Sequence, residues 1–212
     1  MAKNILIVTG SPRVGGNSDI LAEAFAKGAM EAGHSVKTFA AGRADIKPCK
    51  VCDACKAAGK CIFEDDFRKV EPMLAEANVI VLASPIYWYD ISAQLKLVID
   101  KFYSTKAQRN IDESVLILCG AVEDTARFDG AVQVYKRICE GSVQWTDRGV
   151  ILAGGCSSKG DALNHPAWQQ AYELGKTSDY VYLEEASGCG CLFSVLRNCA
   201  TIKTEYRKET AS

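Results

Sequence analysis

Four cysteines lie close together in the stretch CKVCDACKAAGKC, which covers Cys49, Cys52, Cys55 and Cys61. Four thiolates can hold an iron–sulfur cluster, and the compact C-x2-C-x2-C spacing suits a cubane cluster because each step returns the chain to a neighbouring iron. Zinc is less favoured, since structural zinc sites usually combine two separated CxxC pairs. Pro48 and Gly59 predict a turned loop rather than a helix. A cysteine-rich loop without metal is the remaining alternative.

A glycine-rich segment, GSPRVGGNS, occupies residues 10–18 between an apolar run and a helical pattern. Gly15 and Gly16 let the backbone turn tightly and approach a ligand, and Asn17 or Ser18 is a suitable helix cap. The free N–H groups at a helix start attract anions. The spacing matches neither the dinucleotide fingerprint nor the ATP-binding P-loop, so a terminal phosphate fits better than a triphosphate. The alternative is a capped glycine turn without a ligand.

A second segment, SPIYWYDIS, places three aromatic residues directly after another apolar run. We expect the strand to end at Leu82 or Ala83, Pro85 to fix a turn, and a helix to begin near Ser92. Aromatic rings on a loop at the end of a strand contribute little to the core of the sheet, but they are well placed to flank a flat ring. The alternative is an aromatic cluster that covers the sheet end or contacts another subunit.

Five short apolar runs are the elements that must position these segments, at residues 5–8, 36–39, 79–82, 115–118 and 150–152. Helical patterns separate the runs. Short strands that alternate with helices predict an α/β fold with a doubly wound parallel sheet, covered on both faces. Ligands of such sheets bind beyond the carboxyl ends of the strands. We therefore expect both segments, and the cysteine-rich loop after the second strand, to lie at that edge.

Length and composition restrict the class of protein. A chain of 212 residues with 48% hydrophobic and 24% charged residues fits one well-buried domain. A net charge of −1 provides no global basic field for nucleic acid or an anionic membrane. We expect a cytoplasmic protein, because no run is long enough for a signal-peptide core or a membrane span. In that reducing compartment, ten cysteines favour metal or redox chemistry over disulfides.

The two segments together resemble the NAD(P)H-dependent FMN reductase and flavodoxin-like group, over roughly residues 3–177. The resemblance implies a flavodoxin-like, five-stranded parallel sheet of order 2-1-3-4-5 and a bound FMN, which carries the redox chemistry itself. The first segment then holds the phosphate, and the second segment and the loop after the fourth strand line the flavin ring. The implied FMN-binding residues are Ser11, Arg13, Gly16, Asn17, Ser18, Pro85, Ile86, Tyr87, Trp88, Cys119, Gly120 and Ala121. No catalytic side chain is implied.

The cysteine motif and the acidic pair Asp65-Asp66 behind it resemble the iron–sulfur flavoprotein branch of that group. There the matching cysteines ligate a [4Fe-4S] cluster, which implies Cys49, Cys52, Cys55 and Cys61 as ligands. The resemblance also implies a homodimer or a dimer of dimers, NAD(P)H as a transient donor, and a ferredoxin or a small molecule as electron partner. Two alternatives stay open: an NAD(P)H-dependent FMN or quinone reductase without a cluster, and a non-enzymatic, flavodoxin-like electron carrier.

We expect one FMN-binding domain over residues 1–177, including the cysteine-rich loop at 48–66, and a C-terminal extension over 178–212. An amphipathic pattern at 192–202 predicts one more helix there, with a partly ordered tail or a dimer contact as the alternative. Cys189, Cys191 and Cys199 have the chemistry of a metal site or a redox pair, although a solvent-exposed trio without function is the favoured interpretation.

Overall fold

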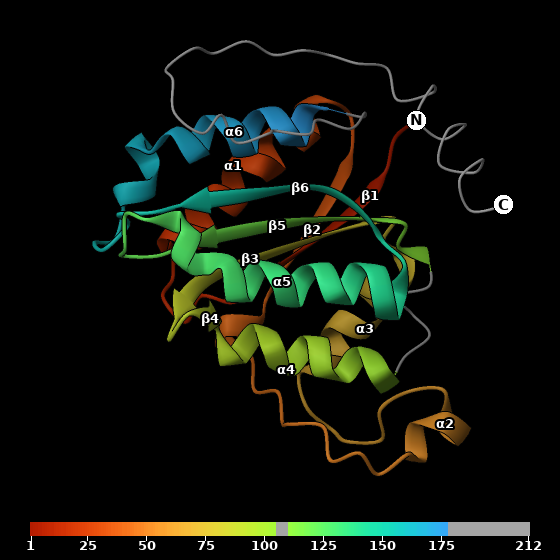
Figure 1. The fold of residues 1–212 in the computed structure, drawn as a ribbon. Coiled ribbons are helices and arrows are strands. Elements are labelled where there is room, and N and C mark those ends of the chain that lie inside the picture. The colour runs from red at the N-terminus through yellow and green to blue at the C-terminus, as the bar shows by residue number, and fades with distance from the viewer. Residues whose placement is uncertain (105–109, 178–212) are drawn as a thin grey trace, which may run out of the picture.

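The computed structural model describes residues 1–104 and 110–177, which contain one sheet with helices on both faces (Figure 1). Its parallel strands are β1 (Asn4–Thr9), β2 (Ser35–Ala40), β3 (Val79–Tyr87), β5 (Glu113–Cys119) and β6 (Thr146–Ala153). Their order is β2-β1-β3-β5-β6, which confirms the predicted parallel order. A sixth strand, β4 (Asp90–Ile91), pairs antiparallel with the end of β3 and was not predicted.

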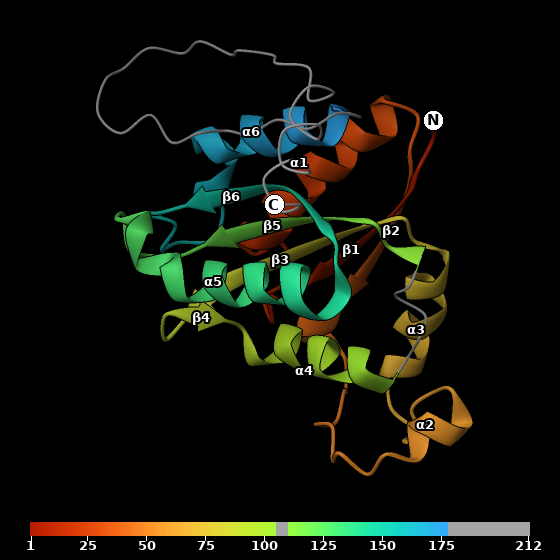
Figure 2. The same ribbon diagram turned by 45° about the vertical axis from the view of Figure 1, so that its right-hand side comes forward.

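Two layers of helices enclose the sheet (Figure 2). The helices are α1 (Asn17–Glu31), α2 (Ala54–Ala58), α3 (Phe67–Glu76), α4 (Ala93–Lys101), α5 (Asp129–Arg137) and α6 (Pro166–Lys176). Five single-turn or slightly longer elements join them: η1 (Ala41–Arg43), η2 (Phe102–Ser104), η4 (Thr125–Phe128), η5 (Ile138–Val143) and η6 (Asp161–Asn164). Helices α1 and α6 cover one face, and α3, α4 and α5 cover the other.

The apolar runs form strands because their side chains fill both helix layers in alternation. In β1, Ile5 and Ile7 pack into the layer of α1 and α6, whereas Leu6 and Val8 pack into the opposite layer. The same alternation runs through β3 and β5, as expected for a strand whose successive side chains point to opposite faces. These strands are buried on both faces, so only their ends are open to a ligand.

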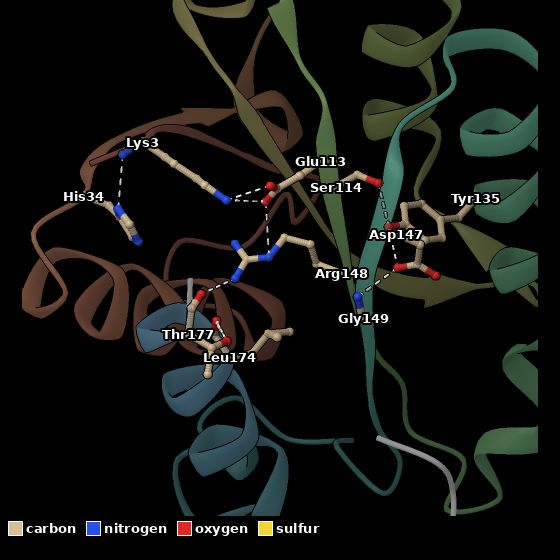
Figure 3. A network of polar contacts seen from close by, with 10 residues as sticks. All are labelled: Lys3, His34, Glu113, Ser114, Tyr135, Asp147, Arg148, Gly149, Leu174 and Thr177. Carbon is tan, nitrogen blue, oxygen red and sulfur yellow. Dashed lines mark hydrogen bonds and ion pairs between the residues drawn. The ribbon is translucent and has the colours of Figure 1, made fainter. Parts of the chain in front are cut away.

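A network of polar contacts ties the amino ends of the strands together (Figure 3). Lys3 and the buried Arg148 both pair with Glu113, at 2.6 and 3.3 Å. Beside them, the Tyr135 hydroxyl donates to Asp147 at 3.0 Å, and burial raises the pKa of Tyr135. None of the predicted site residues belongs to this network, so we assign it to the stability of the fold.

Within residues 1–104 and 110–177, no helix is long and apolar enough to cross a bilayer. The predicted extension over 178–212, with its helix and its cysteines Cys189, Cys191 and Cys199, lies outside the described residues.

Candidate functional site

The predicted site segments meet at the carboxyl edge of the sheet. Because the strands are parallel and in register, Thr9 lies beside Ala83, and Cys119 lies beside both Pro85 and Ala153. The loops that leave β1, β3, β5 and β6 therefore begin side by side. This arrangement is the one expected for a ligand site in a doubly wound sheet.

The segment at residues 10–18 curls back on itself. The Ser11 hydroxyl accepts a hydrogen bond from the Arg13 N–H and donates one to the Arg13 carbonyl oxygen, both at 3.1 Å. Gly15 has a φ of +62°, in the left-handed region that favours glycine. A side-chain carbon on Gly16 would lie 2.5 Å from the Ser11 hydroxyl oxygen. The curl therefore requires glycine at both positions and brings backbone close to any ligand.

Helix α1 starts differently from the prediction, because Gly16 rather than Asn17 or Ser18 is its N-cap. No side chain among the described residues caps the helix. The helix dipole favours an anion at this end, where the Ser18 N–H faces the Cys119 thiol and Asp19 already places one carboxylate in the first turn. The Asn17 amide is used elsewhere, in four hydrogen bonds to the loop after β6.

Arg43, in η1 directly after β2, holds this segment in place, a role that the sequence does not reveal. Its guanidinium donates to the carbonyl oxygens of Ser11 and Arg13 at 3.2 and 3.3 Å, and it pairs with the Asp19 carboxylate at 3.0 Å. At Gly42, a side-chain carbon would lie 2.0 Å from the Ser11 carbonyl oxygen, so η1 packs directly on the segment. Nothing local in the sequence pairs residues that lie so far apart along the chain.

Three buried polar groups at this place have no hydrogen-bond partner among the described residues. They are the hydroxyls of Thr9 and Ser18 and one carboxylate oxygen of Asp19, on residues that are at most 5% exposed. Buried polar groups without partners are rare and cost free energy. The two hydroxyls can donate to a phosphate-bearing ligand beside the helix start, whereas the Asp19 oxygen can only accept and does not favour a phosphate.

The segment after the third apolar run forms a hairpin. β3 continues through Pro85 to Tyr87, so the predictions that the strand ends near Ala83 and that Pro85 turns the chain were wrong. The turn falls at Trp88 and Tyr89, whose φ angles are +51° and +68°. Left-handed angles at both central residues define a type I′ turn, which usually carries Asn-Gly. Aromatic residues there are strained, and such strain concentrates at functional sites.

The aromatic side chains of this hairpin are exposed at the carboxyl edge. Tyr87, Trp88 and Tyr89 are 43%, 94% and 58% exposed. Large exposed aromatic rings on a fixed hairpin provide a surface for a flat ring.

Ser92 connects this hairpin to the first segment. Its hydroxyl donates to the Gly10 carbonyl oxygen at 2.8 Å and accepts from the Leu95 N–H at 3.3 Å, so it caps α4 as predicted for a helix beginning near it. Its own N–H donates to the Ser84 hydroxyl at 2.8 Å. Ser84 and Ser92 are fully buried. Together they fix the hairpin and the residue 10–18 segment as one unit.

The third predicted loop offers mainly backbone. The Cys119 side chain is buried, and burial raises the pKa of its thiol to about 12, so it stays protonated. The Gly120 N–H is bonded to the Ala153 carbonyl oxygen at 3.0 Å, and a side-chain carbon on Gly120 would lie 2.8 Å from Phe128. Ala121 is exposed. Of these three residues, Ala121 is therefore the one placed to meet a ligand.

The acidic pair Asp65-Asp66 holds the two ends of the cysteine-rich loop together. Asp65 accepts hydrogen bonds from the Lys47 and Phe67 N–H groups at 2.9 and 3.0 Å and pairs with Lys101, with both charged side chains buried. Burial raises the pKa of Asp65, but Lys101 and the backbone donors outweigh it, so the pKa is lowered. Asp66 accepts from the Asp45 N–H at 2.9 Å. These contacts fix both ends of the loop.

The four cysteines do not converge in this structure. Cys52 is exposed, Cys49 and Cys55 are partly exposed, and Cys61 is buried. Across the part of the chain that the structure describes, no three cysteine, histidine or acidic side chains are arranged to hold a metal ion. The short helix α2 lies inside the loop, contrary to the predicted turned loop. As arranged, the donor set does not fit a cubane cluster.

The loop also lies away from the carboxyl edge, contrary to expectation. In both views α2 stands at the margin of the molecule, on the side opposite the β3–β4 hairpin (Figures 1 and 2). The cause is α4, which touches Gly10 through Ser92 at its start and holds Asp65 through Lys101 at its end. A helix of that length separates its two ends by about 13 Å.

Comparisons with known proteins agree with this geometry. The family model described as NADPH-dependent FMN reductase matches residues 3–135. An iron–sulfur flavoprotein of Methanocaldococcus jannaschii is 33% identical over 97 residues, which are 46% of this chain and 50% of that protein. A Bacillus subtilis protein, whose name describes an NAD(P)H-dependent FMN-containing oxidoreductase, is 26% identical over 84% of this chain and 99% of its own length. The chain thus spans about half the length of the iron–sulfur flavoproteins it matches.

Solved structures share the fold. An NAD(P)H:quinone oxidoreductase from Methanothermobacter marburgensis superposes with a TM-score of 0.66 at 18% identity, covering 87% of this chain and all of the other. An FMN-dependent NADH-azoreductase from Bacillus anthracis, in complex with FMN, gives 0.59 at 13% identity and covers 82% of this chain and 96% of the other. At such identities the likeness concerns the flavodoxin-like architecture alone.

Proposed function

Because this chain belongs to the NADPH-dependent FMN reductase family, we propose that it is an FMN-dependent oxidoreductase with NAD(P)H as donor and a small molecule, such as a quinone, as acceptor. Bound FMN would supply the hydride and electron chemistry. The protein's own residues bind the phosphate and present the ring. No side chain is required as a general acid or base.

The observation that carries the proposal is the uncapped start of α1 beneath the curled segment. Ser11 and Arg13 lie in the curled segment directly before α1, and Ser18 lies in the first turn of the helix, beside Cys119. Such a helix start binds a phosphate group. Arg43 holds the curl in shape, so the place is preorganised rather than formed on binding.

The ring of the flavin is assigned to the β3–β4 hairpin. Pro85 and Ile86 lie at the end of the parallel sheet, and Tyr87 and Trp88 project beyond it. Because Ser92 joins the hairpin to Gly10, the phosphate and ring contacts keep a fixed separation. Ala121 completes the list of contacts from the loop after β5, with Cys119 and Gly120 acting through packing.

Anaerobic mixing with NADPH or NADH tests this function. We expect the purified chain to carry FMN and the flavin's visible absorbance to disappear rapidly on mixing, then to return when a quinone is added. A chain that keeps its FMN but is not reduced by either nucleotide would instead be an electron carrier. A chain that binds no FMN would contradict the proposal altogether.

We further propose that Cys49, Cys52, Cys55 and Cys61 ligate a [4Fe-4S] cluster, and that a ferredoxin exchanges electrons with a homodimer or a dimer of dimers. The support is the cysteine spacing and the iron–sulfur flavoproteins among the relatives. Because the thiols do not converge in the structure, the loop between its fixed ends must rearrange to bring them together.

Iron and acid-labile sulfide in anaerobically prepared protein test the cluster. Cys52→Ser should lower both while FMN stays bound, and Ala58→Ser, in the same loop, should change neither. Absence of iron and sulfide after reconstitution, with FMN retained, would leave the reductase without a cluster as the function.

A further inference from the structure

The loop after β6 reaches back to the start of α1. Asn17 donates to the carbonyl oxygens of Cys156 and Ser158 at 3.3 and 2.8 Å, and it accepts from the N–H groups of Gly160 and Ala162 at 3.0 and 3.3 Å. Both ends of the Asn17 amide are thereby satisfied by this one loop. The loop after β6 is therefore fixed against the segment at residues 10–18.

This clamp places Lys159 over the curled segment. The ammonium nitrogen of Lys159 and the carbon next to it lie 3.7 and 3.6 Å from the point that a side-chain carbon on Gly15 would occupy. Because Gly15 has no side chain, the lysine lies directly against the backbone of the segment. A side-chain carbon at Gly15 would be in van der Waals contact with the end of the lysine, so the lysine lies beside the segment.

Lys159 carries a charge that no ion pair among the described residues compensates, unlike Arg43. Arg43 is paired with Asp19, so its charge is compensated. Lys159 is exposed, and it forms no ion pair with any residue in 1–104 or 110–177. Arg13 likewise forms no ion pair within these residues, so two cations beside the segment are not bound to a carboxylate, although Asp161 lies in the same loop as Lys159.

We propose that Lys159 is a specificity-determining residue, which contacts the terminal phosphate of the flavin and makes the site prefer FMN over riboflavin. The inference rests on the proposed function and adds a residue from a loop that neither the sequence segments nor the family resemblance assigned. A lysine ammonium is a compact charge on a flexible stem. It can therefore follow a phosphate above the helix start without a fixed bidentate geometry, and an arginine should replace it.

Titration of the apoprotein with FMN and with riboflavin, followed by flavin fluorescence, tests the proposal. Lys159→Met should weaken FMN binding by about two- to fivefold at about 0.15 M salt and by more at low salt, because an exposed ionic contact is modest and screened. Riboflavin, which lacks the phosphate, should bind both proteins equally. Lys159→Arg should retain FMN affinity, and Lys136→Met, an exposed lysine on α5, should match the wild type.

Two results would overturn the inference while leaving the proposed function intact. FMN affinity unchanged in Lys159→Met at low salt would exclude contact with the phosphate. Equal losses for FMN and riboflavin would assign the lysine a structural role in the loop. A wild-type chain that binds neither flavin would overturn the proposed function, and this inference with it.

Discussion

Replacement of Arg43 by methionine should loosen the phosphate-binding segment without removing a predicted ligand contact. The guanidinium makes two hydrogen bonds to the segment's carbonyl oxygens, at Ser11 and Arg13, and one ion pair with Asp19. The arginine side chain is 34% exposed and the Asp19 side chain 6% exposed. Exposed pairs contribute about 0.2–1 kcal/mol and broken buried pairs cost about 3–5 kcal/mol, so we expect a loss of about 2 kcal/mol.

Urea denaturation and FMN titration measure the two consequences. We expect the free energy of unfolding to fall by about 2 kcal/mol, and FMN affinity to fall by about tenfold if most of the ordering energy of the segment is lost. Arg127→Met is the matched control, because its contact with Asp124 spans 3.9 Å on the surface. That variant should change stability by less than about 0.5 kcal/mol.

A double-mutant cycle tests whether Arg43 and Asp19 are energetically coupled. If the arginine acts through the Asp19 carboxylate, then Arg43→Met combined with Asp19→Asn should cost less than the sum of the single variants, by about 1 kcal/mol. Strictly additive costs would refute the coupling. Unchanged FMN affinity in Arg43→Met would refute its role in shaping the segment.

The remaining predictions concern the Lys101–Asp65 pair, His34 and Gly16. Lys101→Met should destabilise the fold by about 3–5 kcal/mol, against less than about 1 kcal/mol for the exposed Lys96→Met. Because the pKa of Asp65 is lowered, its ionised carboxylate stabilises the folded wild type above about pH 4, and this stabilisation is lost as the pH falls through the native pKa. The free energy of unfolding of Lys101→Met, measured with urea, should therefore depend less on acid pH. Burial and nearby cations lower the pKa of His34, so the stability of the wild type should decline as the pH falls below about 6.5. The stability of His34→Gln should not change over that range. An equal decline in the variant would exclude His34 as the cause. Gly16→Ala should weaken FMN binding by about tenfold through the clash with the Ser11 hydroxyl, and wild-type affinity would contradict the curled geometry.

Much of the architecture could be predicted because strands that are buried on both faces appear in the sequence as short apolar runs. The runs at residues 5–8 and 79–82 lie in β1 and in the first part of β3, and parallel pairing places the loops that follow them at one edge. The helix start near Ser92 followed from a capping residue, which is a local signal.

The features that escaped prediction depend on contacts between distant residues or on unusual backbone. Arg43 and Asp19 lie on different elements, and no local pattern pairs them. The hairpin turn carries Trp88 and Tyr89 where glycine or asparagine is the usual signal. The cysteine spacing indicates a ligand type, but the buried pair of Lys101 with Asp65 decides where the loop lies. The spacing of cysteines within a loop does not encode where the two ends of the loop are held.

Hydrogen exchange of the backbone amides, with and without FMN, tests the central claim most directly, because it locates the bound flavin in the unmodified chain. The account predicts slowed exchange at residues 10–18 and 85–92 on addition of FMN, with little change at the amino ends of the strands. Protection absent from both segments, or confined to the cysteine-rich loop, would contradict an FMN site at the carboxyl edge of the sheet.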